Sequence, residues 1–274
     1  MKGQQVRPPI RLALSSGIRL SVSITGRGPT IVFHQGFSLT QRIWSAIVED
    51  LSIDHQCITF DPRGHGQSDI PAGGYSVKQL AADLTELVDV LESTDVTLVG
   101  HSLGGAVSMV SVVNDTAKKR FSKLVLLGPA VPSFVRRAGL PFGVEPAEFA
   151  ALRHSIEQDF AAHAQRTADM FFHRTERAFA QELFAETLAM PTPVASTLFC
   201  ALGDINLTER LSDVAIPVLA LWGKHDKLSD PRWTTWIRDQ NLPLWTVDTL
   251  PHSGHAPMTD EPQVLAARIR DFIR

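Results

Sequence analysis

The chain has 274 residues, of which 44% are hydrophobic, which is enough for one large α/β domain and an inserted subdomain. Its 26 basic and 29 acidic residues are mixed along the sequence and leave a formal net charge of −3, which argues against a nucleic-acid surface. The amino-terminal MKGQQVRPPI lacks the apolar core of a signal peptide, and no run of about 18 apolar residues predicts a membrane span. Cys57 and Cys200 lie far apart in sequence and are expected to be free thiols of a cytoplasmic protein.

The first predicted elements are two runs of alternating polarity, residues 10–16 and 18–24, which meet at Gly17. They indicate a β-hairpin at the antiparallel edge of a sheet. Strands are then expected at 30–34, 57–61, 96–100, 123–128, 217–223 and 244–250, and helices at about 40–51, 76–92, 103–115, 231–239 and 260–273. Apolar strands that alternate with helices predict a mostly parallel eight-stranded sheet with helices on both faces. Such sheets bind ligands at the carboxyl ends of their strands.

A long interval between the strands at 123–128 and 217–223 shows no strand pattern. Residues 146–190 within it are rich in helix formers, and after an interruption at Pro191 and Pro193 a helical pattern resumes. The interval therefore indicates a helical insertion that covers the strand ends. The predicted domains are an α/β core of residues 1–131 and 213–274 and a helical cap of residues 132–212.

The segment VTLVGHSLGGAVSM, residues 96–109, fits the pattern Gly-x-Ser-x-Gly at Gly100, Ser102 and Gly104. A turn this tight between a strand and a helix needs residues without a Cβ at both glycine positions, and it raises the serine hydroxyl above the sheet. The main-chain N–H of Leu103, at the helix start, would then point toward an incoming carbonyl oxygen. The pattern alone also fits a serine that caps a helix. Its position between an apolar strand and a helix favours a nucleophile.

Five motifs in this order resemble those of the α/β-hydrolase superfamily, above all its single-domain esterase, lactonase and haloperoxidase-like branch. They are GPTIVFHQGFS (28–38), DPRGHGQSD (61–69), LVGHSLGG (98–105), IPVLALWGKHD (216–226) and SGHAPMTDEP (253–262). The resemblance covers nearly the whole chain. It implies the α/β-hydrolase fold and a serine hydrolase that acts on a small carboxylic ester, lactone or thioester without a cofactor.

A serine hydroxyl becomes an effective nucleophile only when a base takes its proton. In this fold the chain order is serine, acid, histidine. His255, in the loop before the last helix, is the expected base, with His252 as the alternative. Asp226, directly after an apolar strand, is the expected acid, with Asp230 and Asp248 as alternatives.

The resemblance assigns the second oxyanion donor to the main-chain N–H of Phe37, in the loop after the strand at 30–34. Gln35 stands where the family commonly has histidine, and its side chain is a candidate for contact with a polar group of the substrate. Several apolar residues fit an acyl pocket and fit an ordinary core position equally well: Phe134, Phe142, Met170, Phe171, Phe172, Trp222 and Met258.

Fold and motifs do not fix the substrate. Receptors of the strigolactone and karrikin type keep such a triad with slow turnover, and lyases and acyltransferases use it for other chemistry. Ser102 excludes dehalogenases and epoxide hydrolases, which need aspartate at this position. No Cys or His cluster has metal-ligand spacing and no Gly-x-Gly-x-x-Gly follows a strand, so neither a metal nor a dinucleotide is expected. Three histidines of the insertion are expected on its surface: His154, His163 and His173.

Overall fold

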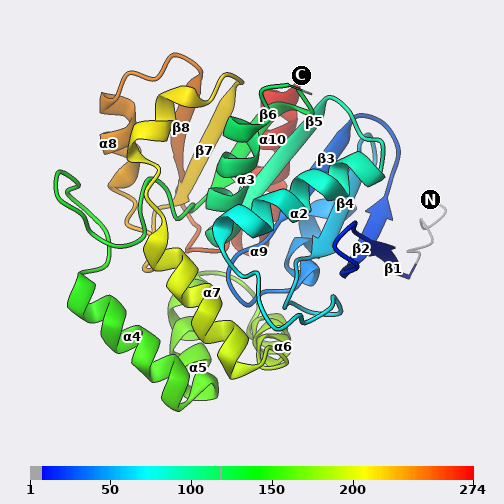
Figure 1. Cartoon of the computed structure of the whole chain (residues 1–274). Coiled ribbons are helices and arrows are strands. Elements are labelled where there is room, and N and C mark those ends of the chain that lie inside the picture. Colours follow the sequence, from blue (N-terminus) through cyan, green and yellow to red (C-terminus); the bar gives the residue numbers. More distant parts are fainter. Residues whose placement is uncertain (1–7, 118) are drawn as a thin grey trace.

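The structure, a computed structural model, describes residues 8–117 and 119–274. A central sheet is flanked by helices on both sides, and a separate group of helices lies beyond one end of it (Figure 1). Residues 1–7, which belong to the segment where no signal peptide is expected, lie outside the described residues. Within the described residues, every helix is too short or too polar to cross a membrane.

The sheet has eight strands in the order β1-β2-β4-β3-β5-β6-β7-β8. Their bounds are β1 Ile10–Ala13, β2 Arg19–Thr25, β3 Thr30–His34, β4 Gln56–Asp61, β5 Val96–His101, β6 Phe121–Leu127, β7 Val218–Gly223 and β8 Trp245–Leu250. β1 and β2 form an antiparallel hairpin, and β2 also pairs antiparallel with β4. The other neighbours are parallel. The predicted edge hairpin and mostly parallel sheet are confirmed.

The sheet is apolar on both faces. Successive side chains of a strand point to opposite sides, and in the central strands both sets are apolar. In β3, Val32 joins one buried cluster while Ile31 and Phe33 join the other. This double burial explains why the central strands read as continuous apolar runs. The helices around the sheet are η1 Gln41–Trp44, α1 Ser45–Leu51, α2 Val77–Val90, α3 Leu103–Asn114, α8 Trp233–Asp239, α9 Pro257–Asp260 and α10 Pro262–Ile273.

The interval between β6 and β7 is helical. It contains α4 Pro146–Gln158, α5 Phe160–Phe171, α6 Arg177–Thr187, α7 Thr192–Asp204 and the short η2 Thr208–Asp213. In Figure 1, α4 to α7 are the green-to-yellow group beyond one end of the sheet. Pro146 and Pro193 lie in the first turns of α4 and α7, where a missing N–H costs no helical hydrogen bond.

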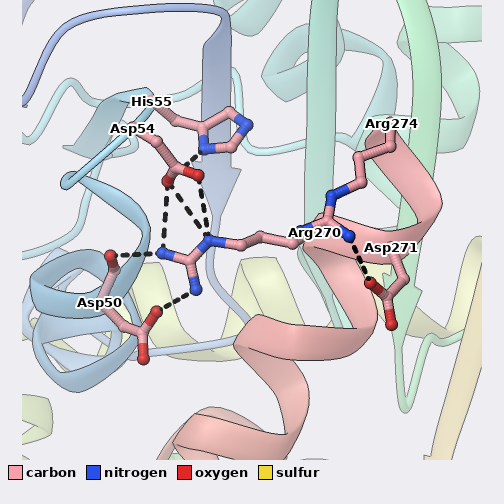
Figure 2. A network of polar contacts seen from close by, with 6 residues as sticks. All are labelled: Asp50, Asp54, His55, Arg270, Asp271 and Arg274. Atoms are coloured by element: carbon pink, nitrogen blue, oxygen red, sulfur yellow. Dashed lines mark hydrogen bonds and ion pairs between the residues drawn. The ribbon is translucent and has the colours of Figure 1, made fainter.

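The carboxyl-terminal helix is fastened to α1 by the network in Figure 2. The Arg270 guanidinium on α10 binds the carboxylates of Asp50 and Asp54 and the main-chain carbonyl of Asp50 at 2.7 Å. His55 Nδ1 lies 2.8 Å from Asp54 Oδ1. Because the loop of Asp54 and His55 leads into β4, this network lies at the amino ends of the parallel strands. It therefore stabilises the fold at the end opposite to the candidate site.

Candidate active site

Ser102 occupies a strained turn between β5 and α3, with φ 52° and ψ −119°. Positive φ is uncommon for a residue with a Cβ. A Cβ at Gly100 would lie 2.5 Å from Ser108 Oγ, and one at Gly104 would lie 2.3 Å from the His34 carbonyl oxygen. Both positions therefore require glycine, because the start of α3 packs directly on the strand and on the neighbouring loop.

A cavity of about 590 Å³ lies above the carboxyl ends of the strands. Ser102, Asp226 and His255 all line it, although they come from three different segments, after β5, β7 and β8. Within the described residues, no hydrogen bond joins the Ser102 hydroxyl to His255. Such contacts are often long in the absence of substrate. The structure thus brings the three predicted residues to one cavity.

Asp226 holds His255 in one orientation. His255 Nδ1 lies 2.8 Å from Asp226 Oδ2. The other carboxylate oxygen, Oδ1, accepts hydrogen bonds from the main-chain N–H groups of Leu228 and Ser229, each at 2.8 Å. An ionised carboxylate can only accept, so Nδ1 of His255 carries the proton and Nε2 keeps a free lone pair. Nε2 is the atom that a base would use.

The alternative residues make other contacts. His252 is exposed, Asp230 pairs with Arg232, and Asp248 pairs with Arg268. Hydrogen bonds from the Arg232 guanidinium also lower the pKa of Asp230. Within the described residues, neither Asp230 nor Asp248 is bonded to His255 and the His252 ring is not bonded to Asp226, whereas Asp226 contacts His255 directly.

The main chain of His255 is held on both sides. Its N–H donates to the carbonyl of Phe171, the last residue of α5, at 2.9 Å. Its carbonyl lies 2.9 Å from Nε2 of His101. Burial, and after it the neighbouring His255, lowers the pKa of His101 well below 6.5, so this ring is neutral and donates through Nε2. His101 therefore holds the main chain of the candidate base in place, a role that the sequence did not indicate.

Asp260 ties the loop of His255 to the segment that follows α5. Its Oδ2 accepts from the main-chain N–H of Gly254 at 2.8 Å. Its Oδ1 accepts from the N–H groups of Arg174 at 2.7 Å and Thr175 at 2.8 Å. Asp260 falls within the SGHAPMTDEP motif, but the motif alone gave it no function. The available signal was an acidic residue shortly after the histidine.

The loop after β3 carries the expected oxyanion donor. A Cβ at Gly36 would lie 2.9 Å from Ser102 Cβ, so this loop passes directly over the serine. Within the described residues, the main-chain N–H groups of Phe37 and Leu103 donate no hydrogen bond. The Gln35 side chain is 1% exposed and donates to a main-chain carbonyl of β4 at 3.0 Å. It joins the loop to β4 and is not among the residues that line the cavity.

The cavity walls are mainly aromatic and aliphatic. Four of the residues predicted for an apolar pocket line it: Phe134, Met170, Phe171 and Phe172. Trp222 and Met258 are fully buried in the core, because β7 and α9 turn them away from the cavity. Phe142 packs instead on Trp233. The expectation that His163 lies on the surface is wrong, since it is 7% exposed and lines the cavity.

Comparisons with known proteins identify the family of this fold. The sequence model of the Alpha/beta hydrolase family matches residues 31–268. The chain belongs to the alpha/beta hydrolase family. It is 27% identical over 253 residues to a pimeloyl-(acyl-carrier protein) methyl ester esterase of Nitrosomonas europaea, covering 89% of this chain and 95% of that one.

Solved structures of other hydrolases share the fold. The esterase EaEST of Exiguobacterium antarcticum superposes with a TM-score of 0.91 at 25% identity, covering 97% of this chain and 99% of that one. A bromoperoxidase of Bacillus anthracis superposes with a TM-score of 0.89 at 21% identity, covering 96% and 99%, which shows the fold alone. The predicted superfamily, the fold and the class of enzyme, an α/β-fold carboxylic ester hydrolase, are confirmed.

Proposed function

We propose that this protein is a serine esterase that cleaves a carboxylic ester with an apolar acyl group through an acyl-enzyme on Ser102. One observation carries the proposal: a strained serine and a hydrogen-bonded Asp226–His255 pair line the same largely apolar cavity. The relative named as a methyl ester esterase and the similarity to the esterase EaEST support an ester as the substrate class.

In the first half of the proposed reaction, Ser102 Oγ bonds to the ester carbonyl carbon while its proton passes to Nε2 of His255. The carbonyl oxygen becomes an oxyanion, which accepts hydrogen bonds from the main-chain N–H groups of Phe37 and Leu103. Asp226 stays ionised and stabilises the imidazolium. The imidazolium then gives its proton to the leaving alcohol oxygen as the carbon–oxygen bond breaks, which leaves the acyl group on Ser102.

In the second half, a water molecule gives a proton to His255 and attacks the acyl carbon. The same two N–H groups stabilise the second oxyanion. When this intermediate collapses, Ser102 Oγ leaves as it regains the proton from His255, and the carboxylic acid is released. Each carboxylate oxygen of Asp226 already accepts a hydrogen bond, so the acid can hold the His255 ring through both halves without moving.

We also propose that residues 132–212 act as a cap that shapes the substrate site. Helices α4 to α7 each contribute residues to the cavity wall, whereas the α/β core contributes residues of the loops that follow its strands. Because Phe134 lies in this segment and lines the cavity, its ring would limit the length of the acyl group.

A fluorophosphonate probe tests the nucleophile directly. We expect the parent chain to be labelled and to release p-nitrophenol from p-nitrophenyl butyrate, and Ser102→Ala to lose both properties. Ser133→Ala removes a second serine that lines the cavity and is expected to remain labelled, since the Ser133 hydroxyl is bonded to the Val135 carbonyl at 2.7 Å. Labelling or parent-level hydrolysis by Ser102→Ala would refute the proposal.

A further inference from the structure

One face of α5 forms a wall of the cavity, and it carries an imidazole among apolar side chains. The residues on that wall recur at the spacing of a helix: Phe160, His163, Ala164, Thr167, Ala168 and Phe171. His163 is only 7% exposed. Its ring contacts Phe199 with centroids 6.0 Å apart, and Phe199 contacts the Phe37 ring at 5.8 Å. The imidazole therefore packs on α7 in the cavity wall, and the Phe199 ring links it to the Phe37 ring of the oxyanion loop.

Neighbouring groups fix the tautomer of His163. Its Nδ1 lies 2.8 Å from Ser155 Oγ. The same hydroxyl donates to the Leu152 carbonyl at 2.7 Å. A hydroxyl has one hydrogen, so both contacts form together only if Nδ1 of His163 is the donor to Ser155. Nε2 then has no hydrogen in the neutral ring and is an acceptor.

The ring is neutral near pH 7. Burial, and after it the positive charge of Arg166, lowers the pKa of His163. Within the described residues, Nε2 makes no hydrogen bond. It is not sealed in the core either, unlike Nε2 of His34 and Nδ1 of His101, which are enclosed without a partner. The free acceptor of His163 is therefore accessible, and the residue that carries it lines the cavity.

The inserted segment also contributes hydroxyl groups to the wall, and these already donate their hydrogens to main-chain carbonyls. Thr167 Oγ1 donates to the His163 carbonyl at 3.1 Å, and Ser133 Oγ donates to the Val135 carbonyl at 2.7 Å. Charged side chains such as Glu148 and Lys227 are exposed and lie at the edge of the cavity. His163 thus presents a nitrogen acceptor without a partner in the wall, beside the hydroxyl oxygens of Thr167 and Ser133, which keep acceptor lone pairs but have no hydrogen left to donate.

We propose that His163 determines substrate specificity by accepting, at Nε2, a hydrogen bond from a hydroxyl group carried by the ester at a distance from the reacting carbonyl. This inference rests on the proposed esterase function. A purely apolar substrate would cover the Nε2 lone pair without replacing its contact with water, which carries a penalty. A keto group at the same place would bring a second acceptor toward it. The ligand class is therefore a hydroxylated ester.

The test compares three methyl esters that differ at one chain position, where they carry a hydroxyl, a keto or a methylene group. The position is moved stepwise along the acyl chain and, in a second series, along the alcohol. At one position we expect kcat/KM of the hydroxy ester to exceed that of the methylene ester roughly three- to tenfold, as for one net hydrogen bond. His163→Phe, which keeps a ring but has no acceptor, should abolish this ratio.

Ser155→Ala is the matched second variant, because Ser155 does not line the cavity and the imidazole keeps its contact with the Phe199 ring to hold it. Without the Ser155 acceptor either nitrogen of the His163 ring can hold the proton. The kcat/KM of this variant for the keto ester should therefore be higher than that of the parent. The inference is overturned if no position favours the hydroxyl more than twofold, if the ratio survives His163→Phe, or if Ser155→Ala leaves the keto ester unchanged.

A binding measurement separates this inference from the esterase proposal. Dissociation constants of the corresponding N-methyl amides, measured by calorimetry on the parent and on His163→Phe, should show the same hydroxyl preference and its loss. Parent-level hydrolysis by Ser102→Ala would overturn the esterase proposal while the amide ratios still test His163. Normal labelling at Ser102 with equal amide affinities would overturn the role of His163 alone.

Discussion

The main-chain N–H of His255 donates to the carbonyl of Phe171 at 2.9 Å, so a hydrogen bond joins the candidate base to the last residue of α5. The two rings also pack together, with centroids 5.0 Å apart. The helix that lines the substrate cavity therefore positions the group that would move the proton. A shift of α5 would be transmitted to His255 through this hydrogen bond.

Asp260→Asn is expected to lower kcat roughly 100-fold with little change in KM, because Asp260 joins the loop of His255 to the segment after α5. An asparagine would place an NH2 group against main-chain donors that now meet a carboxylate oxygen. Steady-state kinetics with a p-nitrophenyl ester measure the effect. Asp159→Asn, at the exposed N-cap of α5, is the control and should cost less than about threefold. Equal kinetics for Asp260→Asn and the parent would contradict the positioning role.

Phe134→Ala and Phe171→Ala are expected to differ in kind. Phe134 lines the cavity and packs on Phe199, at 6.0 Å between ring centroids, so its removal should shift the preferred acyl chain toward longer esters. The Phe171 ring packs on both His255 and His101, so its loss should reduce kcat for every chain length. Profiles of kcat/KM from p-nitrophenyl acetate to decanoate separate the two patterns. Identical profiles for both variants would count against this division.

The core of the fold was predictable because buried strands appear in the sequence as runs of apolar residues. The predicted strand at 30–34 coincides with β3, and the others agree within a few residues. Agreement is good where a strand is apolar on both faces, as in β5 and β7. The bounds of α4, α5 and α6 were not predictable, because the whole stretch favours helix. The breaks between these helices depend on tertiary contacts such as those of Asp260.

The chemistry of the site was predictable to the extent that it is local. Gly-x-Ser-x-Gly encodes the strained turn, and chain order points to Asp226 and His255. The environment of His163 was not predictable, because its burial depends on how α5 meets α7 and the oxyanion loop. Gln35 illustrates the same limit: its position in a motif suggested contact with substrate, whereas its side chain donates to a main-chain carbonyl of β4.

Unfolding should become easier as the pH falls from about 6.5 to about 4. Burial lowers the pKa of His34 and of His65 to about 4, whereas an unfolded histidine titrates near 6.5. Between these values the unfolded chain binds more protons than the folded one, so stability rises with pH. Each histidine contributes up to about 1.4 kcal/mol per pH unit in this window.

Urea denaturation at pH 7, 6 and 5 measures this dependence. His65→Gln should reduce the slope, since it removes one of the buried rings whose pKa is lowered. A free energy of unfolding that stays constant from pH 7 to pH 5 would contradict this prediction.

Asp226→Asn should cripple the enzyme, while Asp230→Asn, four residues along the same loop, should not. The Asp226 carboxylate accepts from Nδ1 of His255 at 2.8 Å, and an amide can place a donor there, which favours the wrong tautomer of the base. The corresponding change in the serine-protease template costs about 10⁴ in kcat, and we expect a loss of roughly 10²–10⁴ here. Asp230 is bonded instead to Arg232, so its neutralisation should lower kcat less than about tenfold.

Both variants are compared on one p-nitrophenyl ester, with thermal melting to establish that each is folded. An active Asp226→Asn beside an inactive Asp230→Asn would move the acid to Asp230 and would require the His255 loop to adopt a different position during turnover.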